Sequence, residues 1–336
     1  MLPPGQREPI HTRMLTVELQ ADEPAAALAR GQVIDLRKRG LVPVPGSLQL
    51  PGVIHHMALR ARIEGDAPAL TRLDVEQRAV AFEPSASTGG ESCRDPAPAL
   101  QALVGRPLDG DFLPALSACF GGPRGCTHLL TLARLLATAA RRALALEADL
   151  AGPPREPGDR FFRRSLTVDG FELPGREMEL VVQLCDVHLV RGVPAASLDR
   201  LALQTEVRAF VRLDFATTGV RELRLEERSR TRAGLDAGFA DRSELVRDLV
   251  GRPLLGGLGA ALVQRFGARP DDAPRLDALL ALAPGYVQCV AAVSDLFLPG
   301  GAAPSASLGA GLDSCFMWRS GGALQTRRAT ASAPER

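Results

Sequence analysis

The sequence predicts an α+β protein of two tandem pseudo-symmetric units, each an antiparallel sheet of about four strands followed by about three helices. Two observations predict this fold. Four segments that alternate between apolar and polar residues precede three segments with helical spacing, and the same order begins again after a Pro/Gly-rich stretch at 151–158. Short motifs also recur at a nearly constant offset, which is typical of an internal duplication.

The elements of the first unit follow in order along the chain. Alternation predicts four strands, at 12–18, 32–37, 53–64 and around 73–82. Helical spacing predicts three helices, at 98–104, at 112–120 and, longest and most amphipathic, at 129–146. Gly125 interrupts the chain just before the long helix, so we expect Cys126 near its N-cap.

The second unit repeats the motifs of the first. The hexapeptide Leu-Val-Gly-Arg-Pro-Leu at 103–108 recurs verbatim at 249–254, an offset of 146. Asp35 is matched by Asp186 at an offset of 151, and Arg13 by Arg164 at the same offset. These matches indicate that the second unit arose from the first.

The polar residues of the first unit are mostly lost from the second. Cys126 and His128 become Leu276 and Ala278 at an offset of 150. We therefore expect four parts. They are a first unit at 1–150 that carries the candidate site, a linker at 151–158, a degenerate second unit at 159–298, and a flexible tail at 299–336 with a docking segment at 313–318.

Composition excludes several classes of protein. The formal net charge of +1 provides no bulk attraction to nucleic acid or to an anionic membrane. We expect neither a signal peptide nor a membrane span, and the six scattered cysteines favour free or metal-bound thiols in a cytoplasm. Arginine-rich, lysine-poor composition favours a bacterial source. A protein partner is possible, but its identity and the oligomeric state are beyond the sequence.

Four residues of the first unit form a candidate metal site: Asp35, Cys93, Cys126 and His128. Two thiolates, an imidazole and a carboxylate suit Zn²⁺, and thiolates also suit an iron–sulfur cluster. A thiol at a helix N-terminus is expected to have a lowered pKa. We place His55 in a second shell around the ligands, and we expect His11 at the surface.

The first half resembles an uncharacterised bacterial domain family. The resemblance covers about residues 11–145 and depends on the Gly-Cys-Thr-His-Leu signature at 125–129, the strand aspartate Asp35, the Ile-His pair at 54–55, and Cys93 before a Leu-Val-Gly helix. It implies no chemistry, because that family has no assigned function. The order of strands, helices and cysteines is also similar in architecture to iron–sulfur scaffold proteins of the NifU/IscU type.

Three interpretations remain open. The first is a metal-binding or iron–sulfur-scaffold-like protein of unassigned biological role. The second is a thiol enzyme, with Cys126 as nucleophile and His55 or His128 as base. The third is a structural or interaction protein without an active site, because cysteine is also a common buried hydrophobe.

Overall fold

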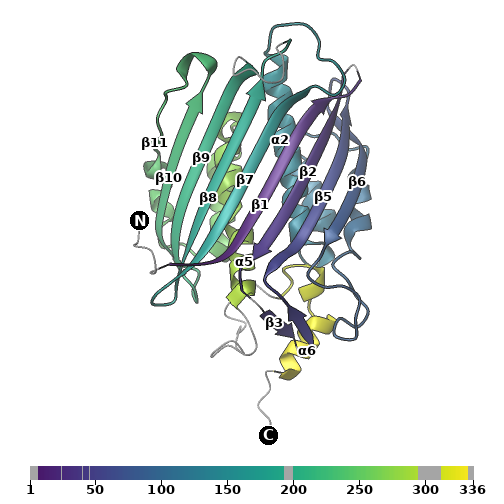
Figure 1. The fold of residues 1–336 in the computed structure, drawn as a ribbon, viewed down its shortest axis with the longest axis vertical. Coiled ribbons are helices and arrows are strands. Elements are labelled where there is room, and N and C mark those ends of the chain that lie inside the picture. Colours follow the sequence, from purple (N-terminus) through teal and green to yellow (C-terminus); the bar gives the residue numbers. More distant parts are fainter. Residues whose placement is uncertain are drawn as a thin grey trace.

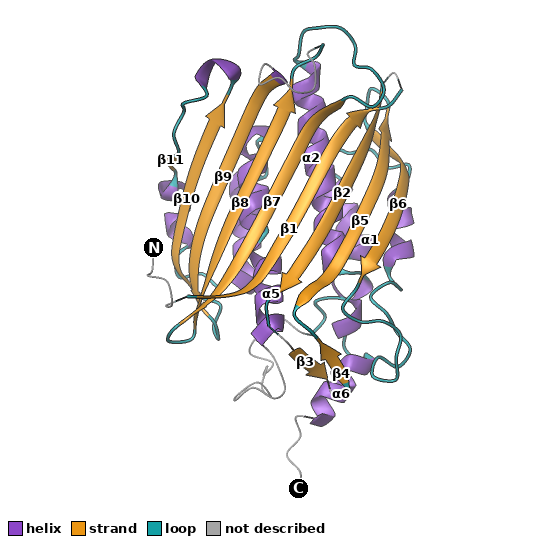
Figure 2. Cartoon of the chain, viewed as in Figure 1, coloured by secondary structure: helices purple, strands orange, loops and turns teal. Residues whose placement is uncertain are grey.

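The chain folds around one large antiparallel sheet, with helices packed against one of its faces (Figure 1, Figure 2). This computed structural model describes residues 7–23, 25–39, 41–44, 46–192, 200–293 and 312–331. The sheet has nine strands in the order β11-β10-β9-β8-β7-β1-β2-β5-β6, and a separate hairpin pairs β3 with β4. The α+β prediction is therefore confirmed at the level of fold class.

All strands of the sheet except the two-residue β11 are long, and their alternation separates a buried face from a more exposed one. They are β1 (Glu8–Ala21), β2 (Ala26–Arg37), β5 (Gly52–Glu64), β6 (Ala69–Ala79), β7 (Arg160–Leu173), β8 (Glu177–Leu189), β9 (Leu201–Asp214), β10 (Val220–Arg230) and β11 (Ala240–Asp241). The hairpin comprises β3 (Leu41–Val44) and β4 (Ser47–Gln49), which the sequence patterns did not predict. In β2, Ala29, Val33 and Asp35 all lie on the buried face, as their spacing of two and four residues requires.

The helices follow each run of strands. The first half has η1 (Ala97–Leu103), α1 (Phe112–Phe120), η2 (Gly122–Arg124) and α2 (Thr127–Ala148). The second half has η4 (Arg232–Gly234), η5 (Ser243–Leu245), η6 (Arg247–Leu249), η7 (Leu254–Leu258), α3 (Gly259–Phe266), η8 (Pro270–Asp272), α4 (Ala273–Leu280) and α5 (Leu282–Val293). The predicted long helix is α2, with Cys126 as its N-cap residue. Its buried face includes Leu129, Leu132 and Leu136. The helix lies behind the sheet in Figure 1 and contacts β2, β5 and β1.

The two runs of strands do not form two separate sheets. β1 pairs antiparallel with β7, so the edges at which the two halves meet are joined into one continuous sheet. Leu15 lies opposite Leu166 in this pair, and Arg13 lies opposite Val168. The pairing satisfies backbone groups that two isolated sheets would leave at free edges.

The C-terminal part packs against the first half. Residues 299–311 and 332–336 of the expected flexible tail lie outside the described residues, whereas residues 312–331 contain η10 (Phe316–Trp318) and α6 (Ala323–Ala331). The backbone N–H of Phe316 donates to the carbonyl of Gly125 at 2.8 Å, and the Thr127 hydroxyl donates to the carbonyl of Ser314 at 2.7 Å. This segment therefore lies beside the N-terminus of α2.

Within the described residues, the stretch Pro270–Val293 is long and apolar enough to cross a membrane by length and composition alone. In this structure 61% of its apolar window is buried inside the protein. A buried core helix passes the same test, so the stretch is weak evidence for a span.

Candidate metal centre

A row of polar side chains crosses the buried face of the sheet. The register places Arg13 of β1 opposite Asp35 of β2, and Asp35 opposite His55 of β5. Residues that pair across neighbouring strands point to the same face, so these three side chains are neighbours. The register shifts just beyond His55, at a β-bulge, a feature that often occurs next to functional sites. All three side chains are buried, and Asp35 is 0% exposed.

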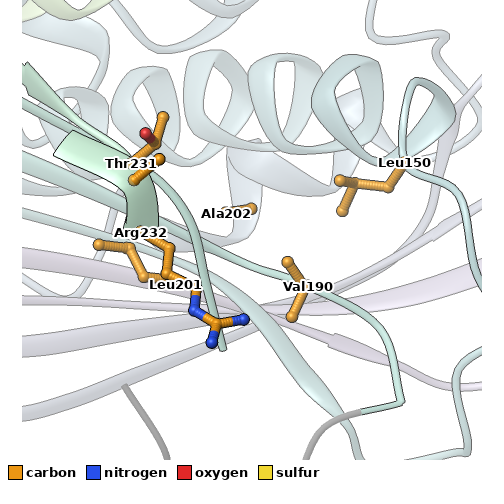
Figure 3. Close-up of a pocket in the computed structure, with 7 residues that line it drawn as sticks. Leu150, Val190, Leu201, Ala202, Thr231 and Arg232 are labelled. Atoms are coloured by element: carbon orange, nitrogen blue, oxygen red, sulfur yellow. The ribbon is translucent and has the colours of Figure 1, made fainter. Parts of the chain in front are cut away.

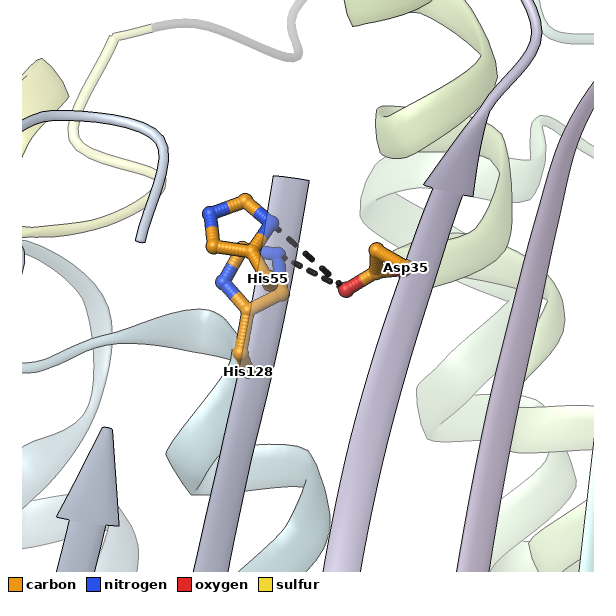
Figure 4. A group of neighbouring side chains, drawn as sticks. All are labelled: Asp35, His55 and His128. Atoms are coloured by element: carbon orange, nitrogen blue, oxygen red, sulfur yellow. Dashed lines mark ion pairs between the residues drawn. The ribbon is translucent and has the colours of Figure 1, made fainter. Parts of the chain in front are cut away.

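The first turn of α2 adds His128 to this row from the opposite side. Nε2 of His128 lies 3.3 Å from Oδ2 of Asp35, and Nδ1 of His55 lies 3.7 Å from the same oxygen. The two imidazole rings lie against each other with centroids 3.6 Å apart and planes tilted by 31°, and Figure 4 shows both directed toward the carboxylate. One ligand atom from each of Asp35, His55 and His128 lies within 4.8 Å of the others. Among the described residues, no other group of three His, Cys, Asp or Glu side chains does so.

The polar atoms that face one another in this group lack hydrogen bonds. Both carboxylate oxygens of Asp35, Nδ1 of His55 and Nε2 of His128 are buried without a hydrogen-bond partner. The same holds for Nε2 of His11, which lies 3.4 Å from Asp35, and for all three guanidinium nitrogens of Arg13. His11 is thus buried, and its expected surface position is wrong. Buried polar groups are rarely left unsatisfied, because each costs about 1–3 kcal/mol.

Burial sets the charge of these side chains. It raises the pKa of Asp35 to about 6, although the nearby Arg13 and Arg37 favour the carboxylate. It lowers the pKa of His11 to about 3, and it lowers the pKa of both His55 and His128 well below the ordinary value, with nearby positive charges adding to the effect. At neutral pH the imidazoles therefore carry lone pairs beside a carboxylate, which is the protonation state that binds a metal ion.

The two predicted thiol ligands lie outside this group. Sγ of Cys126 is 3.5 Å from Nδ1 of His128, on the side of the ring away from Asp35. Cys93 is buried in a separate apolar cluster with Phe82 and Met317. The structure thus brings together only two of the four predicted ligands, Asp35 and His128, and His55 joins them directly rather than from a second shell.

The expected lowering of the Cys126 pKa is also wrong. Burial raises the pKa of Cys126 to about 12, even though the backbone amides of Leu129 and His128 and the charge of Arg13 act in the opposite direction. The N-cap position was predicted correctly. The helix dipole nevertheless contributes less than the loss of water around the sulfur.

A matching row in the second half provides a comparison. Arg164 of β7 lies opposite Asp186 of β8, which lies opposite Thr205 of β9. Arg164 donates two hydrogen bonds to Asp186, each of 2.6 Å, and a third to Asp277 at 2.5 Å. Arg142 adds an ion pair to Asp186 at 3.1 Å. This carboxylate is fully paired with guanidinium groups of the protein.

The two rows differ in whether arginine and aspartate form a bidentate pair. In the first half the closest approach is 3.8 Å, between Nε of Arg13 and Oδ1 of Asp35. A bidentate arginine–carboxylate pair has nitrogen–oxygen distances of about 2.7–2.9 Å. The side chains of Asp35 and Arg13 are therefore close but do not satisfy each other, unlike those of Asp186 and Arg164.

A surface hollow lies far from this group, at the other end of α2. It has a volume of about 610 Å³ and is lined by seven residues of mostly apolar character, Leu150, Val190, Leu201, Ala202, Thr231, Arg232 and Ala233 (Figure 3). Leu150 follows the C-terminus of α2, whereas His128 lies in its first turn. A helix of this length spans roughly 30 Å. None of the predicted site residues lines the hollow.

The role of Arg13 was not predicted, although its match with Arg164 has the same offset as that of Asp35 with Asp186. A charged pair that recurs on adjacent strands was the available signal. The place of His11 in this group was not predicted either, and the sequence contains no comparable signal for it.

A family model described as a protein of unknown function (DUF2889) matches residues 11–142. This range contains Asp35, His55 and His128, and it agrees with the resemblance to an uncharacterised domain family. No curated protein and no solved structure matches the chain. The similarity to NifU/IscU-type proteins remains a prediction.

Proposed function

We propose that this is a cytoplasmic metal-binding protein of unassigned biological role, in which Asp35, His55 and His128 bind a divalent transition-metal ion. Two imidazoles and one carboxylate are the ligand set of many zinc and non-haem iron sites. Such a set leaves coordination positions open for a further ligand.

The observation that carries the proposal is the unsatisfied carboxylate of Asp35. Its oxygens and the facing nitrogens of His55 and His128 are buried, close together and without hydrogen bonds. The matching carboxylate of Asp186 is paired with Arg164 at 2.6 Å. The same fold forms the arginine–aspartate pair in the second half but not in the first. We infer that Asp35 is kept free of Arg13 so that it can bind another cation.

Cys126 has a supporting part in this proposal. Metal-binding imidazoles usually donate their second N–H to an acceptor, which fixes the tautomer and the ring orientation. Sγ of Cys126 lies 3.5 Å from Nδ1 of His128 and meets this requirement. His128 would then present Nε2 to the ion.

The proposal includes an internal duplication. Residues at matching offsets occupy matching places: a bridge pairs Ala69 with Pro107, and another pairs Gly219 with Pro253. β1 and β7 pair around Leu15 and Leu166, which are themselves matched at an offset of 151. These pairings support a pseudo-two-fold axis that relates the two proposed units. The first unit would carry the site and the second would be structural.

The alternative of a thiol enzyme has less support. Cys126 and His128 do approach each other, at 3.5 Å. Burial, however, raises the pKa of Cys126 to about 12 and lowers the pKa of His128 well below its ordinary value. A protonated thiol beside a neutral imidazole is a poor nucleophile. We therefore rank metal binding first.

The test is metal analysis of protein purified anaerobically, with His55→Ala beside His56→Ala. His56 is the matched control because it neighbours His55 and lies outside the Asp35 group. We expect about one equivalent of zinc or iron in the wild type and in His56→Ala, and loss of the metal in His55→Ala. At a free metal concentration 100 times the Kd, binding would add about 2.7 kcal/mol to the free energy of unfolding. A wild type that neither retains nor binds added Zn²⁺ or Fe²⁺, or a His55→Ala variant that binds them normally, would refute the proposal.

A further inference from the structure

Arg13 is buried without a hydrogen bond. Its side chain is 0% exposed, and its Nε, Nη1 and Nη2 atoms all lack a hydrogen-bond partner. Among the described residues its one ion pair is with Asp35, at 3.8 Å between Nε and Oδ1. A guanidinium group has five N–H donors in a fixed planar arrangement, and it keeps its charge inside a protein. These donors therefore lie beside the Asp35 group without an acceptor at hydrogen-bond distance.

Arg164, the matched residue of the second half, shows how the same fold satisfies such a group. Arg164 donates to two carboxylates, to that of Asp186 at 2.6 Å and to that of Asp277, on α4, at 2.5 Å. At an offset of 150, Asp277 is matched by Thr127, which has a hydroxyl in place of the carboxylate. Arg13 therefore lacks the second carboxylate that Arg164 has.

The buried charge around Asp35 is also unbalanced. Arg13 and Arg37 are both buried and carry two positive charges, against one negative charge on Asp35. Protonation of Asp35 or of a neighbouring imidazole would only add positive charge. Among the described residues, no second carboxylate forms an ion pair with Arg13 or Arg37. In the second half, by contrast, two guanidinium groups form ion pairs with two carboxylates.

We propose that Arg13 and the metal ion of the Asp35 group together hold a small carboxylate anion. This inference rests on the proposed function, because one oxygen of the anion would fill a coordination position that the three protein ligands leave open. A planar carboxylate fits the parallel N–H groups of a guanidinium, as Asp186 does on Arg164. Its negative charge would also offset the buried positive charge, which a divalent ion increases and which is costly without a counter-charge.

Burial limits the size of this anion. The side chains of His128 and His55 are 10% and 5% exposed, whereas those of Arg13 and Asp35 are 0% exposed. A ligand would therefore enter on the side of the two imidazoles and reach Arg13 beyond them. So little exposure favours an anion of the size of formate or acetate.

The test is a calorimetric titration of sodium acetate into the zinc-loaded full chain, with Arg13→Met beside Arg60→Met. Arg60, on β5, is the matched control because it is exposed on the opposite face of the sheet. We expect one acetate per chain in the wild type and in Arg60→Met. Binding to Arg13→Met should be at least about 30-fold weaker, because the buried carboxylate would lose its charged partner.

The zinc content of the same samples separates this inference from the proposed function. Arg13 has no lone pair to offer the ion, so Arg13→Met should retain zinc. A wild type that holds zinc but binds no acetate would overturn the inference alone, and so would an Arg13→Met variant that binds acetate as the wild type does. A wild type that binds no zinc would refute the proposed function, and this inference with it.

A second variant keeps the test decisive if Arg13→Met does not fold. Arg13→Lys retains the buried charge but not the planar pair of N–H donors. It should therefore bind acetate at least about 10-fold more weakly than the wild type, as expected when one hydrogen bond to a charged group is lost. Unchanged acetate binding by Arg13→Lys would likewise overturn the inference.

Discussion

The two matched aspartates should respond differently to the same substitution. Asp186→Asn removes the charge that receives two 2.6 Å hydrogen bonds from Arg164 and an ion pair from Arg142. Both guanidinium groups are largely buried, so they cannot recover these interactions from water. Breaking a buried ion pair by removing one partner costs about 3–5 kcal/mol. At roughly 2–4 °C per kcal/mol, the Tm should fall by about 6–20 °C.

Asp35→Asn should cost far less in protein stripped of metal. The carboxylate of Asp35 accepts no hydrogen bond that the substitution could break. Burial raises its pKa to about 6, which means that the fold disfavours this charge relative to water. A neutral amide of the same shape relieves that cost. We therefore expect the free energy of unfolding to change by less than about 1 kcal/mol, or to increase.

The assay is equilibrium unfolding in urea at pH 7.5 with a chelator present, for the wild type and both variants, followed by the same series with saturating Zn²⁺. The metal should stabilise the wild type and Asp186→Asn but not Asp35→Asn. Equal destabilisation by the two substitutions in chelator would refute the reasoning, because it would mean that Asp35 is as well paired as Asp186. An Asp186→Asn variant with the same free energy of unfolding as the wild type would also refute it.

Two further predictions concern the repeated turn and the loss of stability at low pH. Gly105 and Gly251 occupy matching turns at φ of 86° and 88°, where an L side chain is strained. Gly105→Ala and Gly251→Ala should therefore each lower the free energy of unfolding in urea by about 1–2 kcal/mol, and clearly unequal losses would contradict the equivalence of the turns. Burial acts to raise the pKa of Glu147, but hydrogen bonds from His188, Arg155 and other neighbours outweigh it and lower the pKa to about 2. Its contribution, about 1–2 kcal/mol after screening by solvent, is present above pH 4.5 and is lost as the pH falls toward 2. Glu147→Gln should therefore flatten the fall in stability over this range, and an unchanged acid profile would contradict the assignment.

The local patterns predicted the elements well. The predicted helix at 129–146 is α2, Thr127–Ala148, and the predicted strand at 53–64 is β5, Gly52–Glu64. Amphipathic periodicity and glycine breaks are properties of consecutive residues, so one sequence is enough to find them. The β3–β4 hairpin was missed because its strands are short, with three and four residues, and too brief for alternation to be read.

The site was predicted only in part, because register is not local. Asp35 and His128 stood out by residue type and position, but nothing in the sequence shows that His55 pairs opposite Asp35 and that Arg13 pairs on its other side. A shift of one residue in either pair would turn a side chain to the other face of the sheet. The convergence of these residues therefore depends on hydrogen bonds between strands.

The sequence by itself determined the order of strands and helices, the repeated motifs, and the position of Cys126 at the start of α2. Tertiary structure decided three further features. The strands form one sheet, Asp186 is paired with arginine whereas Asp35 is not, and burial raises the pKa of Cys126. The physical reason is the range of the forces. Propensity and periodicity act over a few residues, whereas burial, the pairing of charges and the contact of Ser314 with Thr127 depend on chain segments that only folding brings together.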